Sequence, residues 1–154
     1  MRRRRTRAGR RGGGLLLGLL VLPGVLAGCG GNTSAAPQAT ATAGPGVGTV
    51  TTAADGVQEI TLQTQDDYVF TPSTFTVDPG AVRLTVVNVA KDLTHNFRFT
   101  PGEGPAPIGS EIPLLTAGQE VTIEFQVTEP GDYPFECSFH IQLDQVGTMT
   151  VRGR

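Results

Sequence analysis

The chain has 154 residues, among them twelve basic and fourteen acidic side chains, two histidines and two cysteines. Seven of the basic residues precede residue 12, so residues 29–154 keep five basic against all fourteen acidic side chains, a formal charge of −9. This balance argues against nucleic acid as a partner and favours a protein partner with a basic docking patch.

Residues 1–28 are predicted to be a lipoprotein signal peptide. A cluster of arginines precedes a short apolar run over residues 15–26, about half the ~20 residues that a transmembrane helix needs. The segment ends in Leu26-Ala27-Gly28-Cys29. This matches the lipobox of bacterial lipoprotein precursors, in which the cysteine thiol receives a diacylglyceryl group. We therefore expect an exported protein, anchored through a lipid on Cys29 to the extracytoplasmic or periplasmic face of a cell membrane. A plain secretory signal followed by an incidental cysteine is the alternative.

Residues 29–56 are predicted to be a flexible tether. They consist mainly of Gly, Ala, Thr, Pro, Ser and Asn, with almost no large apolar residue. Such a segment cannot bury a core of its own. Its expected role is to connect the lipid anchor flexibly to the following domain, so that the domain can move above the membrane surface.

Residues 57–154 are predicted to form one all-β domain. Short stretches rich in Val, Ile, Thr and Phe alternate apolar with polar residues, and turn signals such as Asp78-Pro79-Gly80 separate them. Seven or eight short strands in about 95 residues indicate an antiparallel β-sandwich with Greek-key connections. The clearest strands are expected at residues 59–64, 74–77, 82–88, 96–100, 120–127, 132–137 and 147–151.

The candidate metal ligands are the two histidines and Cys137. If Cys29 carries lipid, Cys137 is a lone thiol in an oxidising compartment, where an exposed free thiol is a liability. Cys137 and His140 have the Cys-x-x-His spacing that lets one short loop present both groups to one metal, and His95 lies just before another predicted strand. A thiolate and two imidazoles suit copper in an electron-transfer site. Structural zinc usually has four protein ligands, and a fourth strong donor is missing here.

Three segments of the domain carry a family resemblance. They are residues 70–80, residues 88–97, and the sequence Pro-Gly-Asp-Tyr-Pro-Phe-Glu-Cys-Ser-Phe-His at 130–140 with Gly-Thr-Met-Thr-Val at 147–151. With them, residues 58–151 resemble the cupredoxin family, specifically its plastocyanin-like and azurin-like branch. The resemblance implies a sandwich that holds one copper ion on His95, Cys137 and His140 and passes single electrons between Cu(I) and Cu(II). It also implies that Asn96 ties the two ligand loops together by hydrogen bonds.

One position departs from the usual pattern of this family. Members with this loop normally carry an axial methionine five residues after the second histidine, and here that residue is Gln145. We expect the amide oxygen of Gln145 to be the axial ligand, as in stellacyanin-like members, in preference to Met149 of the last predicted strand. A site without an axial ligand is the third possibility.

The expected function is that of a monomeric one-electron carrier whose partner is a c-type cytochrome or a respiratory complex. We do not expect an enzyme, because one copper without an open coordination position or a nearby acid–base group offers no substrate chemistry. Phe139, Ile141 and Leu143 flank His140, and we expect them to form an apolar patch for electron passage. The alternative is that Ile141 and Leu143 pack under the loop. The alternative function is copper storage or delivery to a respiratory oxidase. The single methionine and two histidines of residues 29–154 weigh against that alternative.

Overall fold

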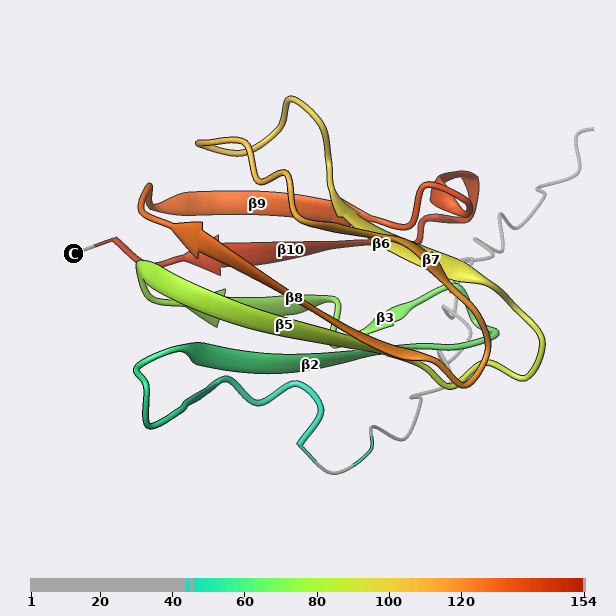
Figure 1. Cartoon of the computed structure of the whole chain (residues 1–154). Coiled ribbons are helices and arrows are strands. Elements are labelled where there is room, and N and C mark those ends of the chain that lie inside the picture. The colour runs from blue at the N-terminus through green and yellow to red at the C-terminus, as the bar shows by residue number, and fades with distance from the viewer. Residues whose placement is uncertain (1–43, 45, 154) are drawn as a thin grey trace, which may run out of the picture. The chain divides into compact units, whose positions relative to one another are not determined.

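The structure, a computed structural model, describes residue 44 and residues 46–153, and these form two β-sheets that lie face to face (Figure 1). Cys29 and the predicted signal peptide lie outside the described residues. The first sheet has the order β1-β2-β5-β8, with β1 at Thr51–Thr52, β2 at Gln58–Thr64, β5 at Gly80–Asn88 and β8 at Glu120–Val127, while β3 (Phe70–Thr71) pairs with β2. The second has the order β4-β10-β9-β6-β7, with β4 at Thr74–Val77, β10 at Val146–Val151, β9 at Gly131–Glu136, β6 at His95–Phe99 and β7 at Glu111–Leu115. Among the described residues, eight strands have four or more residues, and the predicted all-β sandwich is confirmed.

The strands form because every second side chain is apolar and faces the opposite sheet. In β2 the burial alternates along the whole strand, and Ile60 and Leu62 point into the core. Three fully buried rings from three strands meet there: the ring centroids of Phe70, Phe97 and Phe135 lie 5.1–5.9 Å apart. Burying each ring contributes roughly 1.5–3 kcal/mol. Because Phe97 follows His95 by two residues and Phe135 precedes Cys137 by two, this packing also fixes the strands that carry candidate ligands.

The prediction of antiparallel strands is wrong at two strand pairs. β2 runs parallel to β5, and β4 runs parallel to β10. Between β2 and β5 the chain crosses to the second sheet, where it forms β4. It then re-enters the first sheet, so that β5 runs in the same direction as β2. Apolar alternation is the same in parallel and antiparallel strands, so the sequence pattern carries no information on this point.

Three strands, β1, β3 and β7, lie where none is predicted. β7 is an edge strand that contains Pro113, and proline is tolerated at an edge because its missing N–H removes no inner ladder bond. β1 lies within the predicted tether: Thr51 and Thr52 pair with β2, and Val47 forms a bridge with Thr61. The ordered domain therefore begins before residue 57.

The described part of the chain contains one helical element, a single 3-10 turn at Ile141–Leu143. No helix in that part is long and apolar enough to cross a membrane.

Candidate metal centre

The loop between β9 and β10 places Cys137 and His140. Cys137 follows the last residue of β9, and its backbone N–H donates to the carbonyl of Gln145 (3.0 Å), which closes the loop at its base. The N–H of His140 donates to the carbonyl of Cys137 (3.0 Å), and the 3-10 turn follows directly. The turn ends at Asp144, whose φ of 57° redirects the chain into β10. A loop held by its own backbone bonds gives both side chains one fixed direction.

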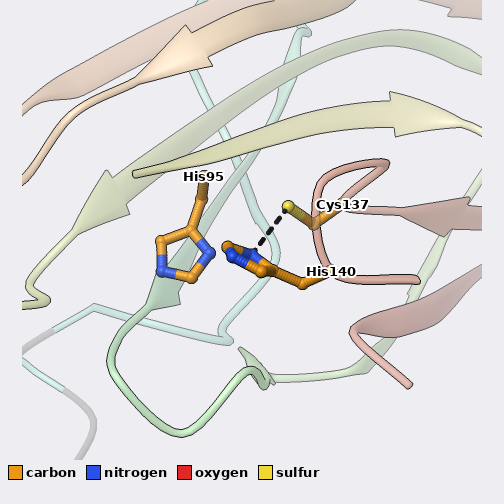
Figure 2. Close-up of side chains that lie close together, drawn as sticks. All are labelled: His95, Cys137 and His140. Atoms are coloured by element: carbon orange, nitrogen blue, oxygen red, sulfur yellow. Dashed lines mark hydrogen bonds between the residues drawn. The ribbon is translucent and has the colours of Figure 1, made fainter. Parts of the chain in front are cut away.

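Strand pairing brings His95 to the same place. β6 and β9 are antiparallel neighbours, with Arg98 opposite Glu136, so the start of β6 meets the end of β9. One ligand atom each of His95, Cys137 and His140 lie within 4.8 Å of one another. Figure 2 shows the three side chains converging, with Sγ of Cys137 3.5 Å from Nδ1 of His140. The structure therefore brings together all three residues of the predicted ligand set.

Gln145 reaches the same cluster, whereas Met149 lies in the core. Oε1 of Gln145 is 2.9 Å from Nδ1 of His95 and 3.1 Å from Nδ1 of His140, and the side chain is fully buried. Met149 is paired in the sheet with Phe75 and Tyr133 and belongs to the hydrophobic core cluster.

The surroundings of His95 keep its imidazole in the form that can bind a metal. Burial is the largest cause that lowers the pKa of His95, and the neighbouring His140 lowers it further, while the hydrogen bond with Gln145 acts in the opposite direction. A neutral imidazole retains a ring-nitrogen lone pair for coordination.

Asn96 joins the two ligand loops as predicted. Its side-chain amide donates to Oγ of Ser138 (2.7 Å), and its Oδ1 accepts the backbone N–H of Ser138 (2.7 Å). The backbone N–H of Asn96 also points at Sγ of Cys137 (3.4 Å). These bonds fix the distance between the start of β6 and the Cys137 loop, and such outer contacts orient ligands and tune a metal site.

An ion pair between Arg98 and Glu136, the residue before Cys137, has no clear sign in the sequence. Glu136 is 2% exposed, and its Oε1 accepts from both Nε and Nη2 of Arg98 at 2.9 and 2.6 Å. Thr100 donates to its other carboxylate oxygen (3.2 Å). The buried carboxylate of Glu136, the residue before Cys137, is thus neutralised by an arginine on the neighbouring strand, which only the β6–β9 register reveals.

The residues around His140 are exposed apolar side chains. Phe139 is 50% exposed, Ile141 39% and Leu143 52%, so these residues form a surface patch and do not pack beneath the loop. The ring of Tyr68 lies 4.9 Å from the His140 ring, centroid to centroid. His140 is half-buried between them, which leaves it as the ligand nearest to solvent.

The donor set fits copper. A buried thiolate, two imidazoles and a nearby amide oxygen combine the soft and borderline donors of a mononuclear electron-transfer site. A two-sheet β-sandwich with this cluster at one end defines the class of small single-domain copper proteins.

Comparison with known proteins places the chain within that class. The family model of the Cupredoxin-like domain matches residues 36–151. Plastocyanin A/B of Petroselinum crispum is 36% identical over 97 residues, which cover 60% of this chain and 98% of that protein. Plastocyanin of Nostoc punctiforme is 35% identical over 92 residues, or 54% of this chain; the match spans 65% of that relative, just under two thirds of its length. The chain therefore belongs to the cupredoxin family, and its cofactor is one copper ion.

Solved structures agree with this fold. Reduced auracyanin from Roseiflexus castenholzii superposes with a TM-score of 0.56 at 23% identity, covering 62% of this chain and 97% of that one. Auracyanin A from Chloroflexus aurantiacus, a "blue" copper protein, has a TM-score of 0.53 at 20% identity and is covered completely by 63% of this chain. At these identities the likeness establishes the shared sandwich only.

Proposed function

We propose that this chain is a lipid-anchored one-electron carrier that works outside the cytoplasmic membrane, with Gln145 as the fourth copper ligand. The observation that carries the proposal is the convergence of the Cys137 thiol, two imidazoles and the Gln145 oxygen in one cluster. Bound copper supplies a Cu(I)/Cu(II) couple that takes up or gives one electron at a time. The plastocyanin relatives support this role.

The residues of the metal centre have different expected roles. Cys137 and His95 are fully buried and would hold a copper ion away from water, while Asn96 keeps their loops at one separation. His140 is half-buried between Tyr68 and the apolar patch of Phe139, Ile141 and Leu143. An electron would therefore enter or leave at the His140 edge, where an apolar partner surface can exclude water. The net acidic surface supports a basic partner such as a c-type cytochrome.

Replacing Gln145 by methionine is expected to raise the reduction potential. An amide oxygen is a harder donor than a thioether and favours Cu(II). Replacing the amide oxygen by a thioether sulfur therefore stabilises Cu(I) relative to Cu(II). A tenfold change in relative stability corresponds to about 59 mV for one electron, and we expect a rise of at least that order. Protein-film voltammetry measures it, with Gln142→Met, an exposed position in the same loop, as the matched control. An unchanged potential in Gln145→Met would remove Gln145 from the ligand set.

The lipid anchor is tested by replacing Cys29 with serine. In a bacterial host, the native chain should incorporate labelled fatty acid and sediment with membranes, whereas Cys29→Ser should lose both properties. Cys137→Ser serves as the control because it removes the only other cysteine and should stay in the membrane fraction. Equal labelling of the native chain and Cys29→Ser would refute the anchor and leave the proposed electron transfer unaffected.

A further inference from the structure

We propose that Thr64 is a positioning residue that sets which atom of the Gln145 amide faces the metal centre. Thr64 ends β2 in the first sheet, and Gln145 precedes β10 in the second, 81 positions further along the chain. This inference rests on the proposed role of Gln145 as a copper ligand, and it adds to that role the group that orients the ligand.

The contact joins the two sheets inside the protein. Nε2 of Gln145 donates to Oγ1 of Thr64 at 2.6 Å, and both side chains are completely buried. Thr64 is the one hydrogen-bond partner of this Nε2 in the described part of the chain. With the amide nitrogen held by Thr64, Oε1 turns to the opposite side, toward Nδ1 of both His95 and His140.

The orientation decides whether Gln145 can bind a metal. The amide oxygen has lone pairs to offer, whereas the amide nitrogen has two N–H groups and no available lone pair. A flipped amide would direct N–H groups at the ring nitrogens of His95 and His140 and remove the oxygen that would bind the metal. A bound copper ion requires the oxygen, so the NH₂ group needs a buried acceptor on the other side. The Thr64 hydroxyl is that acceptor.

Thr64 is itself held in place. Its register partners are Phe70 in β3 and Asn88 in β5, and its carbonyl accepts the N–H of Val89 (2.9 Å). A β-branched side chain in a paired strand has restricted χ1 freedom. The Thr64 hydroxyl therefore has a fixed position on the first sheet, from which it orients the amide of Gln145 beside the second sheet.

The experiment uses the full chain and five variants: Thr64→Val, Thr64→Ala, Thr64→Ser, Gln145→Met and the double variant Thr64→Val/Gln145→Met. Valine keeps the volume of threonine and removes the acceptor, alanine removes it without an added methyl group, and serine retains it. The first readout is the reduction potential of the copper-loaded chain. The second is solvent exchange of the Gln145 side-chain amide protons in the copper-free, ¹⁵N-labelled chain, which does not depend on the metal.

Thr64→Val and Thr64→Ala should each raise the potential in the same direction as Gln145→Met, whereas Thr64→Ser should keep the native value. In the copper-free chain, valine and alanine should speed exchange of the Gln145 amide protons about tenfold, the factor that one ordinary hydrogen bond confers. Adding Thr64→Val to Gln145→Met should change the potential no further, because the amide through which Thr64 acts is gone.

The two proposals fail in different ways. If Gln145→Met leaves the potential unchanged, Gln145 is not a ligand and the proposed function loses its fourth donor. If Gln145→Met raises the potential while Thr64→Val and Thr64→Ala do not, Thr64 does not position the ligand. The inference would also be overturned if Thr64→Val shifted the reduction potential equally in the native chain and in Gln145→Met. Such a result would mean that Thr64 does not act through the Gln145 amide.

Discussion

Replacing Cys137 by serine is expected to abolish the intense red-region absorption of the copper-loaded chain. That absorption arises from charge transfer between a thiolate and Cu(II), and Cys137 is the one cysteine in the described part of the chain. A serine hydroxyl is a far weaker ligand that stays protonated at neutral pH, so affinity for copper should fall together with the colour. A Cu(II) titration followed by visible and EPR spectroscopy measures both effects.

The matched control for this prediction is Cys29→Ser. It removes the other cysteine of the chain, at a position outside the metal cluster that the structure describes, and should leave the absorption band at full intensity. Circular dichroism should show that both variants keep the β-sandwich, because serine is close to cysteine in size. A full-strength band in Cys137→Ser would contradict the assignment of Cys137 as a ligand.

Replacing Gly147 by alanine is expected to cause a large loss of stability. A Cβ at this position would overlap the ring of Phe135 and lie 2.5 Å from the carbonyl oxygen of Ser73. The Phe135 ring is fully buried and packs on Phe70 and Phe97, so it has no space to move. Overpacking of a core costs about 1–3 kcal/mol, and a clash with both backbone and a buried ring should reach about 3 kcal/mol.

Guanidinium unfolding of the copper-free chain measures this loss. Gly109→Ala is the control, because a Cβ at Gly109 meets no atom within 4 Å and the backbone is not in the left-handed region. We expect Gly147→Ala to shift the unfolding midpoint strongly and Gly109→Ala to leave it almost unchanged. Similar midpoints for the two variants would show that β10 can move away from Phe135. Because Gly147 follows Gln145 by two residues, that movement would also displace the proposed axial ligand.

Much of the metal centre could be predicted because its residues are close in sequence or carry a family pattern. The Cys-x-x-His spacing identifies Cys137 and His140 within one loop, and the His-Asn pair at 95 and 96 marks the second loop. The resemblance also implies that Asn96 ties the two loops together by hydrogen bonds, and in the structure these bonds go to Ser138. Periodicity of apolar residues likewise locates the long strands.

The remaining features depend on contacts between residues distant in sequence. Strand direction leaves no trace in the alternation of side chains, so the parallel pairs β2/β5 and β4/β10 were not foreseeable from pattern alone. An isolated threonine 81 residues from Gln145 gives no sign that its hydroxyl meets the amide. The pairing of Arg98 with Glu136 likewise requires the β6–β9 register. Chain topology, and no local motif, brings these groups together.

The central claim is a single copper ion on a thiolate and two imidazoles that exchanges one electron reversibly. The most direct test is titration of the full chain with Cu(II), followed by visible spectroscopy, EPR and one cycle of reduction and reoxidation. The account predicts an intense red-region band that saturates at one equivalent, bleaches on reduction and returns on oxidation. A colourless chain that binds Cu(I) alone would contradict electron transfer and indicate copper storage or delivery. A chain that binds neither oxidation state would contradict the copper site itself.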